Sequence, residues 1–262
     1  MDVDGLKWTI TRKFVLKYLK NFGYNMRHMD NYIEEECRAL VQLRVDGGGR
    51  PVLVNTMFHV SVVNIMWRLV AVTKEDIHVV CLDLLEAGME TVSNTAVFML
   101  LHLVRNEEVQ RKLQKEIDEV IGHARTPTVI DRTRMMYTEA VILETLRISS
   151  VAAVGIPHMA LKSERLGNYI IPKGTFLLLA MHDLHNGNHW KDPDAFRPER
   201  KRRCIGEGMA RSELFMFLTH LLQRFNMRIP EEDPLPSTEP IDGLTLSAKP
   251  FRVIFEPRLL GG

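Results

Sequence analysis

The sequence has few cysteines, no long apolar run and almost no net charge, and each shortage excludes a class of protein. Three cysteines in 262 residues are an odd, sparse set, which excludes a disulfide framework and favours a reducing compartment. A formal net charge of +1 argues against binding nucleic acid through bulk electrostatics. The longest apolar runs, 97–101 and 176–181, are far shorter than the ~20 residues of a membrane span.

The beginning of the sequence also lacks a targeting signal. The first residues read MDVDGLKWTITRK and have no apolar core of the kind that a signal peptide needs. We therefore expect no membrane anchor and no export signal in this chain. Apolar residues make up 45% and charged residues 26%, which is the balance of a soluble globular protein.

Hydrophobic periodicity predicts a mainly α protein with a small β portion. Asn55 and Asn106 are expected N-caps, and Gly122 is an expected helix terminator. Strand composition covers 164–183, with Pro172 to Gly174 as its turn, and 244–258 is predicted to be a β-hairpin. The expected helices cover residues 6–21, 28–45, 55–72, 74–105, 106–122, 135–148 and 206–225.

Cys204 has unusual neighbours, because the stretch 200–208 reads RKRRCIGEG. Nearby cations and a following helix N-terminus both favour the thiolate form of a cysteine, which is the form that binds metals. The alternative is a structural cysteine beside a solvated basic run. Cys37 and Cys81 lie in helical apolar patterns and are expected to be inert core residues.

Two further motifs lie inside predicted helices. In AGMET (87–91), Glu90 and Thr91 interrupt an apolar helix, where a threonine hydroxyl can bond the carbonyl one turn earlier and an adjacent acid can relay protons. A solvated helix face is the alternative. In ETLR, Glu144 and Arg147 stand three residues apart and can pair, and spacing alone favours a surface ion pair.

Three histidines, His182, His185 and His189, lie close together in the sequence HDLHNGNH. Metal sites use such clusters. However, Gly187 flanked by two asparagines argues against a regular helix face, so this segment is predicted to be a loop, and a zinc site is not favoured.

The order AGMET, ETLR, FRPER and CIGEGMAR resembles the cytochrome P450 family of haem-thiolate monooxygenases, in its microsomal group of vertebrate drug-metabolising enzymes and insect relatives. The resemblance extends over the whole chain. It implies an incomplete cytochrome P450 fold as one partial domain over 1–262. Its parts are N-terminal helices (1–73), the central helices (74–148), a small sheet with a Pro-rich segment (149–200), and the ligand-loop remnant with the last helix and hairpin (201–262).

The resemblance also implies roles for individual residues. Cys204 corresponds to the axial ligand of the iron in haem b (iron protoporphyrin IX), whose electron donation favours O–O cleavage. Glu90 and Thr91 correspond to the catalytic pair that assists proton delivery. The segments 149–155 and 245–250 would line the substrate pocket. The implied structural triad, a buried one that fixes the proximal side, is Glu144, Arg147 and Arg200. The other implied haem contacts are Trp8, Arg12, Ala87, Gly88, His158, Arg202, Gly206 and Ala210.

The chain departs from the family pattern at two places. Arg197 and Arg200 stand where the ligand loop has phenylalanine and glycine, and only three residues separate the PER arginine from Cys204. Four residue steps reach at most about 14 Å. Over so short a distance, the role of Arg200 in the triad conflicts with the role of Cys204 as the ligand of the iron. The helices that roof the substrate pocket are missing near 71–75. We expect an internally deleted member of the family.

The function implied is insertion of one oxygen atom from O2 into a lipophilic small molecule, with electrons from NADPH through NADPH–cytochrome P450 reductase. The family location is the cytosolic face of the endoplasmic reticulum membrane. No nucleic acid is an expected partner. Two alternatives stay open: a catalytically inactive truncated product with a structural or interaction role, and an unrelated helical binding protein.

Overall fold

A computed structural model describes residues 13, 27–70, 78–187, 192–196, 198 and 207–258 of the chain. The fold is mainly helical with a small sheet portion, as the sequence predicts. The longer helices are α2 (Arg27–Asp46), α3 (His59–Val70), α4 (His78–Arg105), α5 (Glu107–Val120), α6 (Met136–Ser149) and α8 (Glu207–Arg224). Two short ones are the 3-10 helix η2 (Val129–Arg134) and α7 (Met181–Asn186).

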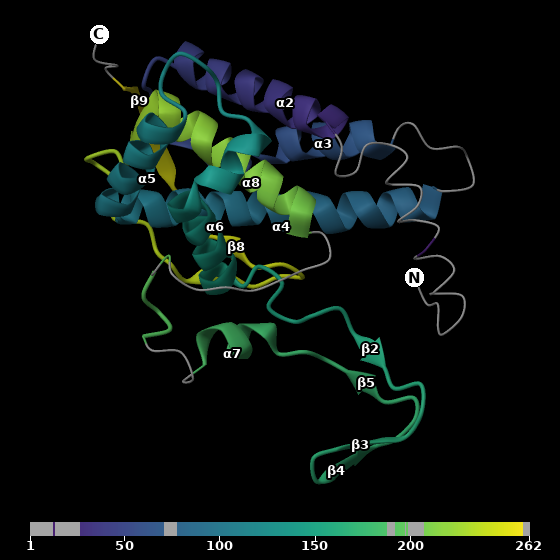
Figure 1. Ribbon diagram of the computed structural model, residues 1–262. Coiled ribbons are helices and arrows are strands. Elements are labelled where there is room, and N and C mark those ends of the chain that lie inside the picture. Colours follow the sequence, from purple (N-terminus) through teal and green to yellow (C-terminus); the bar gives the residue numbers. More distant parts are fainter. Residues whose placement is uncertain are drawn as a thin grey trace.

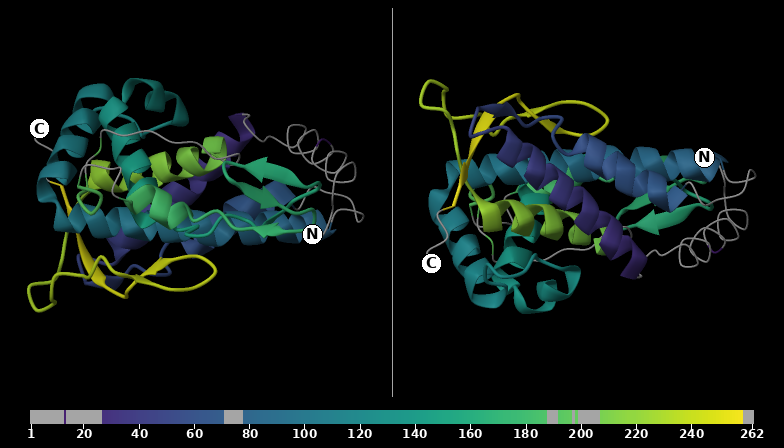
Figure 2. Two further views of the ribbon diagram at one scale, coloured as in Figure 1. Left: turned by 90° about the horizontal axis from the view of Figure 1, so that it is seen from below. Right: turned by 90° about the horizontal axis from the view of Figure 1, so that it is seen from above.

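The helices form one body around α4 and α8. Helix α3 packs along α4, α2 packs along α8 and against α3, and α5 and α6 contact both α4 and α8 (Figures 1 and 2). Within the described residues, no helix is long and apolar enough to cross a membrane. The predicted helix 6–21 and the segment 71–77 lie outside the described residues.

The core is built from the apolar sequences of α4 and α8. Every residue from Val97 to Leu101 is buried, so α4 is enclosed on all sides there, as its nearly continuous apolar sequence predicts. In α8, Phe217 is fully buried and its ring lies 5.1 Å from that of Phe58. Cys37 is also fully buried, which confirms the prediction that it is a core residue.

A three-stranded sheet closes one end of the body. Its order is β1 (Val52–Leu53), β9 (Arg252–Pro257) and β6 (Phe225–Arg228), with Val52 opposite Val253 and Met227 opposite Phe255. The predicted hairpin over 244–258 is therefore wrong, because β9 pairs with strands far away in the sequence. The neighbouring β8 (Ser247–Ala248) pairs with β7 (Pro240–Ile241).

Of the two predicted asparagine caps, Asn106 is at the N-cap position of its helix and Asn55 is not. Helix α3 begins at His59, and Asn55 instead donates from Nδ2 to the carbonyl of Ala248 (2.8 Å). Asn106 does occupy the N-cap position of α5, but its side chain makes no capping bond and donates backwards to the His102 carbonyl. Gly122 follows α5 with φ of 72°, so its predicted role as a terminator is confirmed.

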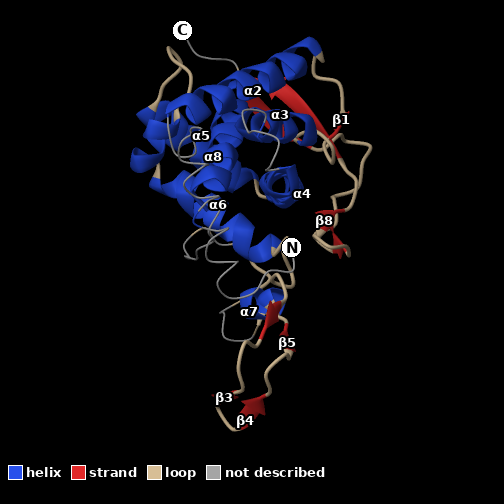
Figure 3. Cartoon of the chain, turned by 90° about the vertical axis from the view of Figure 1, so that its right-hand side faces the viewer, coloured by secondary structure: helices blue, strands red, loops and turns tan. Residues whose placement is uncertain are grey.

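Residues 153–186 form an arm that projects from the helical body (Figures 1 and 3). Strand β2 (His158–Met159) pairs with β5 (Phe176–Leu177), and β3 (Glu164–Leu166) pairs with β4 (Tyr169–Ile171). The predicted turn is present, since Thr175 N donates to the Pro172 carbonyl. The predicted loop over HDLHNGNH is wrong for Met181–Asn186, which form α7. His189 lies outside the described residues.

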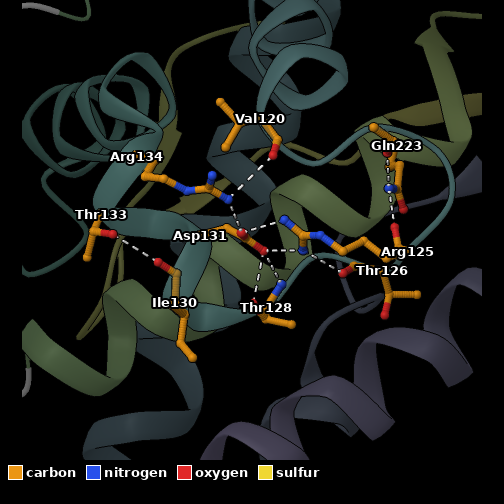
Figure 4. A network of polar contacts seen from close by, with 10 residues as sticks. Val120, Arg125, Thr126, Thr128, Ile130, Asp131, Thr133, Arg134 and Gln223 are labelled. Carbon is orange, nitrogen blue, oxygen red and sulfur yellow. Dashed lines mark hydrogen bonds and ion pairs between the residues drawn. The ribbon is translucent and has the colours of Figure 1, made fainter.

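A buried carboxylate fixes the connection between α5 and α6 (Figure 4). Asp131 accepts two bonds from Arg125 (2.6 and 2.7 Å), one from Arg134 (3.0 Å), and bonds from the backbone N and hydroxyl of Thr128 (both 2.9 Å). Although burial opposes it, these donors hold the pKa of Asp131 well below its ordinary value of 3.8. Gln223 of α8 donates to the carbonyl of Arg125, which ties the connection to the core.

Replacing Asp131 with asparagine is expected to lower the free energy of unfolding by about 2 kcal/mol at pH 7, a figure kept modest because Arg125 and Arg134 are half-exposed. The folded-state pKa is depressed, so the contribution is present above pH ~4 and is lost as the pH falls below that. Urea unfolding of both proteins at pH 7 and pH 3 measures this. A difference that does not shrink at pH 3 would contradict it.

A second buried acid lies where α8 faces α2. Glu213 is 1% exposed, and its Oε2 has no hydrogen-bond partner among the described residues. Burial raises the pKa of Glu213 from 4.5 to about 8. The thiol of Cys37 is close enough that Glu213 contributes to raising its pKa, after burial itself. Glu213 is therefore neutral in the folded protein near pH 7.

Because its folded-state pKa is raised, the stability that Glu213 contributes is full below pH ~4.5 and is lost as the pH rises through about 8. We expect the unfolding free energy to fall by about 3 kcal/mol from pH 5 to pH 8. Glu213→Gln removes the titration and should flatten this profile in urea unfolding. Glu119→Gln, at an exposed position, is the control. Parallel profiles for Glu213→Gln and the unaltered chain would show that Glu213 does not titrate there.

Candidate functional site

The AGMET segment lies in the middle of α4, where the helix passes from a partly exposed to a fully buried stretch. The hydroxyl of Thr91 donates to the Ala87 carbonyl at 2.7 Å, the bond one turn earlier that the sequence predicts. Thr95 repeats it by donating to the Thr91 carbonyl at 2.7 Å. Such bonds give the threonine hydroxyl a fixed direction along the helix.

Gly88 faces a neighbouring helix. A Cβ at this position would lie 2.8 Å from the Cε of Met66 and 3.0 Å from its Sδ, so the room that glycine leaves is filled by a side chain of α3. The resemblance to the cytochrome P450 family implies haem contacts at both Ala87 and Gly88. The structure gives the space at Gly88 to helix packing.

Glu90 is held on another side of α4. Its Oε2 accepts a bond of 3.0 Å from the hydroxyl of Thr245, which is 155 residues later in the chain. Asn94, one turn further along α4, donates from Nδ2 to the same hydroxyl at 3.2 Å. Thr245 belongs to the loop before β8, and its neighbour Leu246 donates to the Val151 carbonyl. The two segments expected to line the pocket, 149–155 and 245–250, therefore meet beside Glu90.

The remaining side of α4 fits a flat, apolar cofactor. Ala87 is exposed and Thr91 half-buried, and the two share one face because they are four residues apart. Gly88 points to α3 and Glu90 to the Thr245 loop, so neither covers that face. A small methyl beside a hydroxyl with a fixed direction would leave room for a flat ring such as haem at this face. Ala87 and Thr91 fit such a group, whereas Gly88 is occupied by Met66.

Glu144 and Arg147 form a buried ion pair in α6. Glu144 is 0% and Arg147 4% exposed, and the guanidinium binds the carboxylate through two bonds of 2.9 and 2.8 Å. A surface pair, which spacing alone favours, is therefore wrong. Arg147 also donates to the carbonyls of His185 (2.9 Å) and Ala195 (3.3 Å). It thus fastens the segment that leads towards residue 200 onto the body.

Two histidines surround this pair. Ser150 Oγ lies 2.8 Å from Nδ1 of His185, which anchors α7. His102 of α4 is buried and stacks on Phe196 with ring centroids 4.6 Å apart. Burial, and then the charges of Arg105 and Arg147, lower the pKa of His102 to about 4, so it is neutral. His102 and His185 thus pack around Arg147, and the neutral His102 adds no charge there.

The structure places two other predicted haem contacts. His158 lies in β2 on the exposed arm, and Ala210 is half-buried in the first turns of α8 against the core. The other predicted site residues lie outside the described residues: Trp8, Arg12, Arg200, Arg202, Cys204 and Gly206. Within the described ranges, no group of His, Cys, Asp and Glu side chains could hold a metal ion.

Thr245 and Asn94 are the site residues that sequence reasoning did not single out. Thr245 fell inside a segment expected to line the pocket, but nothing in its neighbourhood linked it to Glu90, because the two are far apart in the chain. Asn94 reads as one polar residue in an apolar helix, and only the folded loop shows its partner.

Comparison with known proteins gives one family. The family model for cytochrome P450 matches residues 68–200 and 201–255, so the match divides between Arg200 and Lys201. The farnesoate epoxidase of Bombyx mori is 50% identical over 371 aligned positions, which cover 97% of this chain and 75% of that enzyme. Because 371 positions exceed the 262 residues of the chain, the alignment includes stretches of the epoxidase that have no counterpart here.

Vertebrate relatives and solved structures agree. The steroid 17-alpha-hydroxylase/17,20 lyase of Ovis aries is 38% identical over 199 residues, 67% of this chain but 39% of that enzyme. The chain thus spans about two fifths of the length of such relatives. A zebra fish cytochrome P450 structure with progesterone superposes with a TM-score of 0.85 at 23% identity, covering 95% of this chain and 82% of the other, a likeness of fold.

Proposed function

The chain belongs to the cytochrome P450 family, and from that membership we propose that it is a haem-thiolate monooxygenase that inserts one oxygen atom from O2 into a lipophilic small molecule. Enzymes of the family bind haem b and receive electrons from NADPH through a reductase. Substrate, O2, NADPH and a proton would give the oxygenated product, water and NADP+. The arrangement at Glu90 and Thr91 is the observation that carries the proposal for this chain.

Haem, when bound through Cys204, supplies the activation of O2. The chain's own residues have four tasks. Ala87 leaves a small face against which the ring can lie, Thr91 presents a hydroxyl fixed by its bond to the Ala87 carbonyl, and Glu90 supplies a carboxylate from which protons can pass. The buried pair of Glu144 and Arg147 holds the segment before the ligand loop in place.

Farnesoate is the first substrate to test, because the epoxidase of Bombyx mori is 50% identical. NADPH–cytochrome P450 reductase is the electron donor that we propose, at the cytosolic face of the endoplasmic reticulum. Purified chain, haem, reductase and NADPH under 18O2 are expected to give a product that carries one 18O atom. A product that carries no 18O would refute the proposed reaction. So would the absence of product from farnesoate and from every member of a panel of steroids, terpenoids and fatty acids.

A second candidate is a catalytically inactive form with a structural or interaction role. Two observations favour it: the alignment with the epoxidase passes over stretches that the chain lacks, and the family match divides three residues before the predicted ligand cysteine. A folded chain that takes up no haem would support this candidate. Stoichiometric haem uptake with turnover would exclude it.

A further inference from the structure

The loop from 242 to 248 is fastened to the helical body on two sides. Leu246 donates its N–H to the Val151 carbonyl at 2.8 Å. On the other side, Asn55 donates to the Ala248 carbonyl at 2.8 Å and accepts from the Phe251 N–H at 3.2 Å. These bonds join the loop to the end of α6 and to the approach of α3, so the loop has a fixed place beside α4.

The loop also turns sharply just before the threonine. A Cβ at Gly243 would lie 2.9 Å from the carbonyl oxygen of Thr245, a distance that real Cβ atoms do not reach against backbone. The turn therefore requires glycine at 243. Thr245 is half-buried, and its backbone has little freedom to move away from α4.

The Thr245 hydroxyl has a defined direction. It has one hydrogen, and Asn94 Nδ2 can only donate to it, so the oxygen accepts from Asn94 (3.2 Å) and its hydrogen goes to Glu90 Oε2 (3.0 Å). Asn94 is buried, whereas Glu90 is exposed. The buried amide thus orients the hydroxyl that holds the exposed carboxylate of Glu90, and a hydrogen bond to a carboxylate is among the stronger ones.

We propose that Thr245 is a positioning residue for Glu90, holding its carboxylate at one place against the 242–248 loop, with Asn94 setting the direction of the bond. A glutamate on an exposed helix face otherwise samples several rotamers. Fixing it gives the carboxylate one defined position on the turn of α4 that also carries Thr91. This inference rests on the proposed function for its consequence in catalysis, and on the hydrogen bonds of Thr245 to Glu90 and Asn94 for the positioning itself.

Two variants separate the hydroxyl from the shape of the side chain. Thr245→Val keeps the shape and removes the hydroxyl, and Thr245→Ser keeps the hydroxyl. Thr133→Val is the matched control, because Thr133 is an exposed threonine whose hydroxyl donates to the nearby Ile130 carbonyl. Glu90→Ala removes the acceptor and completes a double-mutant cycle with Thr245→Val.

The first measurement needs no haem. In hydrogen exchange of the purified chain, the amides of 242–248 are expected to exchange about threefold faster or more in Thr245→Val and in Glu90→Ala, with no further increase in the double variant. Thr245→Ser and Thr133→Val should match the unaltered chain. Unchanged exchange in Thr245→Val, or additive effects in the double variant, would overturn the proposal.

The second measurement is product formed per NADPH consumed. It should fall about 5- to 10-fold in Thr245→Val, recover in Thr245→Ser and stay unchanged in Thr133→Val. If Thr245→Val is active and forms as much product per NADPH as the unaltered chain, Thr245 only stabilises the loop, and the positioning role is overturned. If the unaltered chain makes no product, the proposed function fails, and the exchange cycle alone decides whether Thr245 holds Glu90.

Discussion

Arg147→Ala is expected to lower the free energy of unfolding by about 3–5 kcal/mol, because it removes the guanidinium that binds a fully buried carboxylate. Glu144 is 0% exposed and its two oxygens receive both bonds of the Arg147 guanidinium. The change also releases the carbonyls of His185 and Ala195. Urea unfolding at pH 7 measures the loss.

A matched control is Arg165→Ala, which removes an exposed arginine on the arm and should change the unfolding free energy by less than about 0.5 kcal/mol. The double variant Glu144→Leu with Arg147→Ala should recover part of the loss, since no charge then stays buried. If the free energy of unfolding of Arg147→Ala lies within about 1 kcal/mol of that of the unaltered chain, the ion pair of Glu144 and Arg147 does not hold the segment before residue 200 in place.

Cys204→Ala is expected to abolish product formation, by at least about 100-fold, because it removes the only thiolate that the resemblance places under the iron. Cys37→Ala is the control. Cys37 is fully buried in α2. Its replacement by alanine is expected to lower the free energy of unfolding by about 1 kcal/mol and to leave turnover unchanged. The 18O2 incorporation assay measures both variants.

Cys204→Ala with turnover equal to that of the unaltered chain would mean that another group binds the iron. Loss of turnover in Cys37→Ala at a temperature where that variant stays folded would mean that the effect of cysteine replacement is not specific to position 204. Circular dichroism at the assay temperature decides whether each variant is folded.

Local sequence signals predicted the helices well, because a helix depends on nearby residues. The apolar sequence of α4 predicted a central helix, and Val97 to Leu101 are indeed enclosed on all sides. Gly122 ends α5 as expected, since a positive φ at that place needs glycine.

Features that depend on distant partners were not predicted. Asn55 has the composition of a helix cap, but tertiary bonds to Ala248 and Phe251 take its side chain. Strand β9 reads as half of a local hairpin, yet it pairs with β1 and β6, which lie far earlier in the chain. No local pattern distinguishes these arrangements from the ones expected.

The candidate site divides in the same way. The Thr91 bond to the Ala87 carbonyl is local and was predictable from spacing. Burial of Glu144 and Arg147 was not, since the same spacing occurs on helix surfaces, and only the resemblance indicated it. The contact between Gly88 and Met66 and the bond from Thr245 to Glu90 required the packed structure.

We propose that Cys204 binds haem iron as a thiolate despite the short stretch that joins it to Arg200. The absorption spectrum of the purified, haem-loaded chain, reduced and treated with carbon monoxide, tests it most directly. We expect the red-shifted Soret band that marks thiolate ligation, and we expect Cys204→Ala to lack this band. No haem uptake, or a Soret band that is the same in Cys204→Ala, would contradict it.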